Sequence, residues 1–251
     1  MEKPMQGKRV FFLHPHSVIQ DEMLQLFIAA EVNVSLIWDH AKTLRVLRKF
    51  PDSLLFVNID EGLEESKWEL FISSLMKHEP TKNVRIGVLS YNEDFELAQK
   101  YLVDVGVQCG FIVLKLGLKE SAKILMKTLD ANEVRGRRAH IRVNCRESDR
   151  ATCNFKLKGG YVSGKILDIS SAGFACLCEE IAGLKVGTSV NDIQLKLGSV
   201  LCLVSGKVLG TQERSNGPFV VMFDFSRVST RERQKILQFV YQHNQREIDE
   251  I

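Results

Sequence analysis

The chain has 251 residues, of which 45% are hydrophobic and 26% charged, and its formal net charge is +3. These values are typical of a globular protein and exclude a chain that is disordered by composition. Its apolar runs are far shorter than the roughly 20 residues of a transmembrane helix, so we expect no membrane insertion and a cytoplasmic location. Six cysteines without CxxC spacing predict free, mostly buried thiols.

The basic residues are concentrated in one short segment. Residues 1–130 contain 16 Lys and Arg against 18 Asp and Glu, whereas residues 131–251 contain 18 against 13. Six arginines lie from Arg135 to Arg150, with no lysine among them. Such a concentration favours a planar anion such as phosphate, because the guanidinium group binds it bidentately. A solvated loop is the alternative that this charge run leaves open.

The first half of the chain alternates short apolar runs with amphipathic stretches of helical spacing. The apolar runs predict five buried strands, at residues 10–13, 34–38, 54–59, 85–90 and 110–116. Five strand–helix units predict a doubly wound parallel sheet with helices on both faces. In such sheets, ligands bind beyond the carboxyl ends of the strands.

This half resembles a response-regulator receiver domain, which has a flavodoxin-like fold, over nearly its whole length. The resemblance implies an acidic pair after the first strand, a phosphoacceptor aspartate after the third, Ser or Thr after the fourth and Lys after the fifth. The corresponding residues here are His14 and His16, Asn58 followed by Asp60, Ser90, and Lys115. Magnesium requires carboxylate oxygens, so we expect a degenerate receiver domain that is not phosphorylated. The two histidines lack an evident third ligand, and we expect no metal site.

The sequence pattern changes near residue 132, where the last predicted helix of the first half ends. We therefore expect two domains, residues 1–132 and residues 133–251, joined by the arginine segment. From residue 152 onward, short period-two runs with glycine turns predict a small antiparallel β domain. Residues 230–248 then predict one amphipathic helix, with Ser229 as its N-cap and Glu232 completing a capping box.

Two motifs in the second half are the strongest signals in the sequence. Arg138 and Arg142 form RxxxR, and Asp168, Ser170 and Gly173 form DxSxxG between two predicted strands. The second motif alone is also typical of a structural turn. Together with the short strands and the terminal helix, the two motifs resemble the PilZ family over nearly all of this half.

The resemblance implies a six-stranded β-barrel with a C-terminal helix that binds the bacterial second messenger cyclic diguanylate, without another cofactor. The chemistry agrees, because arginine pairs with phosphate and with the Hoogsteen edge of guanine. A carboxylate accepts hydrogen bonds from guanine N1–H and its N2 amino group. Arg137, next to the motif, would help to hold a stacked pair of ligand molecules. The expected ligand-binding residues are Arg137, Arg138, Arg142, Asp168, Ser170 and Gly173.

We expect an effector rather than an enzyme, because no catalytic constellation is recognisable and His140 and His243 each stand alone. Ordering of the arginine segment on ligand binding would transmit the messenger level to a protein partner. The family resemblance suggests flagellar, motility or other envelope machinery as that partner. The alternative is a transcription regulator that contacts the nucleic-acid backbone through its arginines. Since the output half is rich in strands and lacks a helix-turn-helix pattern, we expect no nucleic-acid binding.

Overall fold

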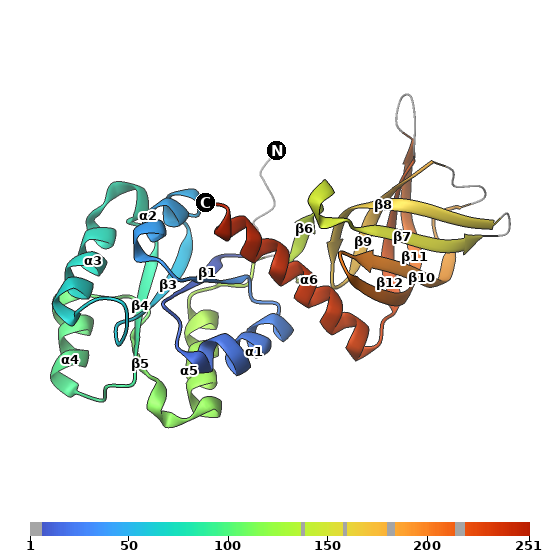
Figure 1. The fold of residues 1–251 in the computed structure, drawn as a ribbon. Coiled ribbons are helices and arrows are strands. Elements are labelled where there is room, and N and C mark those ends of the chain that lie inside the picture. Colours follow the sequence, from blue (N-terminus) through green and yellow to red (C-terminus); the bar gives the residue numbers. More distant parts are fainter. Residues whose placement is uncertain (1–6, 137–138, 158–159, 180–183, 214–218) are drawn as a thin grey trace. The chain divides into compact units, whose positions relative to one another are not determined.

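The computed structural model describes residues 7–136, 139–157, 160–179, 184–213 and 219–251 (Figure 1). Its contacts divide the chain into two compact units, the first formed by Met1–Ala139 with Asn244–Ile251 and the second by His140–His243. The division predicted from the sequence, between residues 132 and 133, did not assign the end of the chain to the first unit. Among the described residues, no helix has both the length and the apolar character needed to cross a membrane.

The first unit contains a parallel five-stranded sheet in the order β2-β1-β3-β4-β5. Its strands are β1 (Arg9–Leu13), β2 (Val34–Ile37), β3 (Ser53–Asn58), β4 (Arg85–Ser90) and β5 (Phe111–Val113). Its α-helices are α1 (Leu24–Ala29), α2 (His40–Lys49), α3 (Glu65–Lys77), α4 (Phe95–Gln99) and α5 (Leu118–Ala131). This strand order is that of flavodoxin-like folds, so the predicted receiver-like architecture is confirmed.

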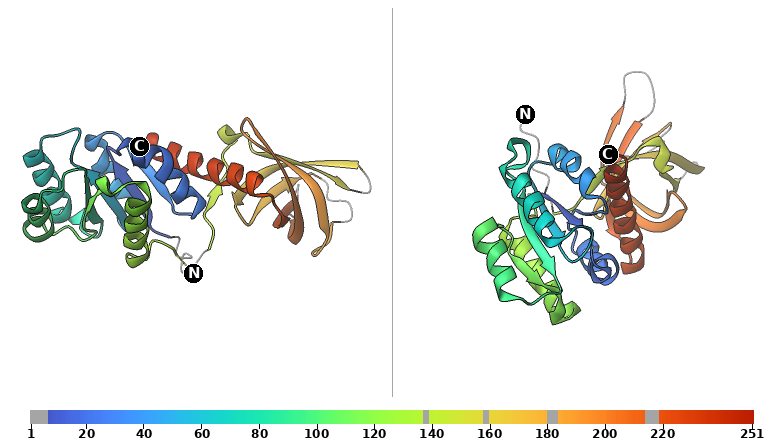
Figure 2. Two further views of the ribbon diagram at one scale, coloured as in Figure 1. Left: turned by 90° about the horizontal axis from the view of Figure 1, so that it is seen from below. Right: turned by 60° about the vertical axis from the view of Figure 1, so that its left-hand side comes forward.

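Helices cover both faces of this sheet (Figures 1 and 2). Successive side chains of a strand point to opposite faces, and β1 shows the consequence. Phe12 stacks on Phe27 of α1, with ring centroids 5.4 Å apart. Its neighbour Phe11 is buried in a different cluster, together with Trp68 and Ile72 of α3. The continuous apolar runs of the sequence therefore correspond to strands that are buried on both sides.

The second unit is an antiparallel barrel followed by a helix. Its strands are β6 (Arg142–Asn144), β7 (Thr152–Leu157), β8 (Gly160–Ser170), β9 (Gly173–Cys178), β10 (Ser189–Leu197), β11 (Val200–Glu213) and β12 (Phe219–Arg227), and the helix is α6 (Thr230–Asp249). The strand order is β6-β8-β7-β10-β11-β12-β9, and β9 also pairs with β8. Strands β7 to β12 thus close into the predicted six-stranded barrel. A further short strand, β6, precedes the predicted strands and pairs with the end of β8.

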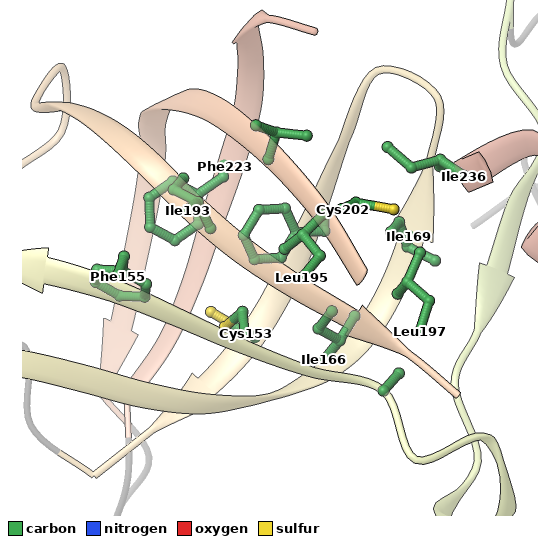
Figure 3. Packing of buried hydrophobic residues seen from close by; sticks show 14 of the residues in the cluster. Cys153, Phe155, Ile166, Ile169, Ile193, Leu195, Leu197, Cys202, Phe223 and Ile236 are labelled. Carbon is green, nitrogen blue, oxygen red and sulfur yellow. The ribbon is translucent and has the colours of Figure 1, made fainter. Parts of the chain in front are cut away.

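The barrel encloses an apolar core (Figure 3). The ring of Phe223 stacks on Phe174 at 4.9 Å and meets Phe155 edge-on at 5.3 Å between centroids. Ile236 of α6 is fully buried in the same cluster, so the first part of this helix covers the barrel core. The six cysteines are free and five of them are buried, as predicted.

The start of α6 confirms one half of the predicted cap. The hydroxyl of Ser229 accepts a hydrogen bond from the backbone N–H of Glu232 at 3.2 Å. The carboxylate of Glu232 instead accepts from the backbone N–H of Leu203 and pairs with Lys235. The reciprocal bond of a capping box is therefore replaced by a bond that fastens the helix to β11.

The end of α6 completes the first unit at its edge strand β2. The side-chain amide of Gln245 accepts from the backbone N–H of Leu36 at 2.8 Å and donates to its carbonyl oxygen at 2.9 Å. The carboxylate of Glu247 pairs with Arg9, and Ile248 lies in the cluster that contains Phe11. These contacts satisfy backbone groups that an open sheet edge would leave to water or to another chain.

We expect Ile248→Ala to destabilise the first unit by about 2–5 kcal/mol, because Ile248 is 1% exposed and its truncation leaves a cavity. Leu70→Ala is the matched control, since Leu70 is 70% exposed in the same unit and its loss should change stability by about 0.5 kcal/mol or less. Chemical denaturation of the whole chain measures both. Equal midpoints for the two variants would contradict the assignment of residues 244–251 to this core.

Candidate ligand-binding site

Strand β6 brings the arginine segment against the DxSxxG motif. In the antiparallel register, Arg142 pairs with Ser170 and Asn144 pairs with Asp168, while the intervening residues of both strands are buried. Because side chains alternate along a strand, these four residues share one face of the sheet. Two motifs that are distant in the sequence therefore meet at one position in the fold.

The centre of this site is an ion pair between Arg142 and Asp168, whose Nε and Oδ1 atoms are 3.4 Å apart. The arginine side chain is 50% exposed and the aspartate side chain 21% exposed. Against β9, strand β8 holds one extra residue between Ile166 and Asp168, which is a β-bulge. Bulges redirect the side chains that follow them, and this one precedes the motif's carboxylate directly.

Ser170 and Gly173 form the turn that follows Asp168. The hydroxyl of Ser170 donates to the carbonyl oxygen of Gly173 and accepts from the backbone N–H of Ala172, both at 3.3 Å. Ser170 is 2% exposed, so its hydroxyl is used within the turn. A Cβ atom on Gly173 would lie 2.1 Å from the carbonyl oxygen of Phe223 in β12, so only glycine fits there.

A further pair of residues, which the sequence analysis did not assign to the site, lies beside this turn. The hydroxyl of Ser171 is 2.8 Å from Nδ1 of His140, within hydrogen-bond distance. His140 lies inside the RxxxR segment, two residues before Arg142. Its position within the RxxxR motif could have identified His140 as part of the site, but the sequence shows no recognisable partner for it. The predicted residues Arg137 and Arg138 lie outside the described residues.

The thiol closest in sequence to these residues, Cys145, is half-buried. Burial raises its pKa to about 12, and the negative charges of Asp149 and Asp168 act in the same direction. A thiol of such high pKa stays protonated at neutral pH and is a poor nucleophile. Among the described residues, no group of three or more His, Cys, Asp or Glu side chains is arranged to hold a metal ion.

In the first unit, Asp60 lies where a receiver domain would carry chemistry, and both of its carboxylate oxygens have partners. Oδ1 accepts from the hydroxyl of Ser90 at 2.5 Å, and Oδ2 accepts from the backbone N–H of Tyr91 at 2.7 Å. Nε2 of His16 lies 3.1 Å from Oδ2. Burial lowers the pKa of His16, whereas the Asp60 charge acts in the opposite direction. This carboxylate is held by hydrogen bonds within the protein.

The other residues aligned with receiver positions have structural contacts. The side-chain amide of Asn58 donates to the carbonyl oxygen of His14 at 2.7 Å, and its oxygen accepts from the backbone N–H of Asp60 at 2.9 Å. Lys115 follows β5 in a short 3-10 turn, is exposed and pairs with Glu93 at 3.1 Å. The fifth strand thus ends at Val113, before this lysine, and the lysine pairs with Glu93.

Comparison with known proteins agrees with this architecture. A family model described as the PilZ domain matches residues 136–242. Among solved structures, the PilZ domain of YcgR from Escherichia coli with c-di-GMP is 21% identical, covering 45% of this chain and 95% of that chain, with a TM-score of 0.39. The MrkH–c-di-GMP complex of K. pneumonia is 17% identical, covering 47% and 57%, with a TM-score of 0.43.

The first unit has a separate structural neighbour. The chemotaxis response regulator CheY4 of Vibrio cholerae is 16% identical, covering 51% of this chain and 99% of that chain, with a TM-score of 0.42. The match to a second structure of YcgR from Escherichia coli spans 49% of that chain, and the match to MrkH spans 57% of its chain. No curated protein sequence is similar enough to count as a relative.

We expect the protein to remain unphosphorylated when it is incubated with acetyl phosphate and magnesium. The oxygens of Asp60 already accept hydrogen bonds, and histidines occupy the positions of magnesium-binding carboxylates. Intact-mass spectrometry measures the outcome, with a phosphorylatable receiver domain as the positive control. A stable phosphoprotein that disappears in Asp60→Ala would contradict this expectation.

Proposed function

We propose that the chain is a receptor for cyclic diguanylate, because a family model described as the PilZ domain matches residues 136–242. One observation carries the proposal: β6 places Arg142 and Asp168 3.4 Å apart on one face of the barrel, beside the DxSxxG turn. An arginine and a carboxylate at this spacing offer a cation to phosphate and an acceptor to guanine. These are the two chemical groups that a cyclic dinucleotide presents twice.

Arg142 and Asp168 have separate roles in the proposed site. Arg142 binds a phosphate or the O6 and N7 atoms of a guanine, because its half-exposed guanidinium can turn towards a ligand. Asp168 accepts hydrogen bonds from the N1–H and N2 amino group of a guanine. Their ion pair keeps both charges compensated before the ligand binds.

The remaining predicted residues divide into two groups. Ser170 and Gly173 shape the turn, since their contacts are internal to it, and they position backbone groups for the ligand. Arg137 and Arg138 supply further cations from the preceding segment, and Arg137 supports a stacked pair of ligand molecules. This is a binding function without catalysis, in which the ligand is released unchanged.

The proposed output is a change in the arginine segment that a protein partner detects. The segment follows α5 without a spacer rich in Gly, Ser or Pro. Closure on a dinucleotide orders the residues before β6, and such an ordering step is an established route from a small ligand to a larger rearrangement. The ligand shifts this equilibrium only by its difference in affinity for the two states.

We expect Arg142→Ala and Asp168→Ala each to weaken cyclic diguanylate binding about 10- to 150-fold, because each removes charge-assisted hydrogen bonds worth roughly 1.5–3 kcal/mol. Calorimetric titration measures the affinity. Arg231→Ala is the matched control, since it removes an exposed arginine from the start of α6. Unchanged affinity in both site variants, with wild-type binding intact, would disprove the site.

We expect cyclic diguanylate to slow hydrogen exchange of the backbone amides across residues 130–142, because ligand closure orders this segment. Small-angle scattering of the same samples reports any accompanying change in the whole chain. The Arg142→Ala protein at the same ligand concentration is the control, in which the protection should be reduced. Identical exchange with and without bound ligand would show that the segment does not transmit binding.

A further inference from the structure

The DxSxxG turn contains two serines, and their hydroxyls have different partners. Ser170 is hydrogen-bonded within the turn, to Gly173 and Ala172. Ser171 reaches outward from the motif to Nδ1 of His140 at 2.8 Å. The hydroxyl that connects the turn with the arginine segment is therefore that of Ser171.

We propose that His140 and Ser171 form a latch that holds residues 140–142 on the DxSxxG turn before ligand arrives, and so sets the affinity of the site. The inference rests on the proposed function. Neither residue needs to touch the ligand, so both are positioning residues. Their effect is exerted through Arg142, which follows His140 by two residues.

The need for such a latch follows from the length of β6. Only three residues, Arg142 to Asn144, form this strand, and Arg142 is its first residue. A strand end frays readily, because the last backbone hydrogen bonds have no neighbour beyond them. The bond from His140 to Ser171 lies just before this end and opposes fraying there.

The burial of the two residues agrees with this role. Ser171 is almost completely buried, whereas His140 is half-buried. The hydroxyl is fixed by the turn, so it offers a defined position to the imidazole. The backbone that carries Arg142 is then anchored on both sides, by this side-chain bond before it and by the pairing with β8 after it.

A latch and a direct ligand contact predict different kinetics. Without the latch, a smaller fraction of the free protein has Arg142 in its binding position. The apparent Kd rises in inverse proportion to that fraction. The association rate constant therefore decreases, while the dissociation rate constant of the closed complex stays nearly unchanged. Removal of a direct contact would instead accelerate dissociation.

The experiment compares Ser171→Ala, His140→Ala and the double variant with the wild-type full chain, by calorimetry and by stopped-flow binding of cyclic diguanylate. Each single variant should raise the Kd about 2- to 12-fold, the value of one ordinary hydrogen bond, through slower association. The loss in the double variant should be smaller than the product of the two single-variant losses, because both mutations break the bond that the two residues share.

The matched control is Ser163→Ala, which removes a serine hydroxyl from β8 itself. That hydroxyl donates to Asn154 at 2.6 Å, on the part of β8 that pairs with β7. This variant should bind as the wild type does. Thermal unfolding of all variants shows whether each is folded, and the inference can be tested with either single variant alone.

Three results would overturn the latch: an unchanged Kd in the folded variants, losses that multiply in the double variant, or a loss confined to faster dissociation. Failure of the proposed function is distinguishable, because then the wild-type chain does not bind cyclic diguanylate at all. In that case, hydrogen exchange of residues 139–144 in the absence of ligand tests whether the latch exists. Faster exchange in both variants supports the latch, and unchanged exchange rejects it.

Discussion

The closure of the barrel on β8 is the constraint on which the candidate site depends. This strand pairs with β7 along its first part, with β9 across its middle and with β6 at its end. Closing the sheet fixes its register, and the bulge before Asp168 then determines where that carboxylate lies. The position of the turn after Asp168 is also fixed, because Gly173 packs directly on the backbone of β12. The site is therefore built on the most constrained strand of the barrel.

Asp60 and Asp168 both lie at positions where the sequence suggests a functional carboxylate, but their surroundings differ. Asp60 is bonded by a serine hydroxyl and a backbone N–H, so its charge is compensated by fixed groups of the protein. Asp168 lies beside Arg142, whose side chain is half exposed. A half-exposed partner is screened by solvent, whereas buried hydrogen bonds such as those of Asp60 are costly to break. The first unit thus has receiver-like architecture, and its Asp60 is held by hydrogen bonds within the fold.

Most of the fold was predictable, because apolar runs and period-two alternation report burial directly. The five strands of the first unit agree with the apolar runs of the sequence, although β5 is shorter, and the period-two runs after residue 152 correspond to the barrel strands. Strand β6 escaped detection because three residues are too few to show alternation. The hydrogen bond from Ser170 to Gly173 and the His140–Ser171 bond depend on side-chain orientation in a turn. The membership of Ile248 in the first unit's core depends on tertiary packing. These side-chain and tertiary contacts leave no periodic signal in the sequence.

The ion pair between Arg142 and Asp168 affects the energy balance of the proposed binding. Because the arginine side chain is 50% exposed, solvent screens the pair, and breaking it opposes the proposed ligand binding only weakly. Its two members are nevertheless unequal in the presence of a dianionic ligand. Without Arg142, the charge of Asp168 remains beside the phosphates and repels them. In the proposed site, loss of Asp168 would release the guanidinium of Arg142 to the phosphates. We therefore expect loss of the arginine to weaken binding more than loss of the aspartate, and we propose that Asp168 contributes to guanine selection more than to attraction.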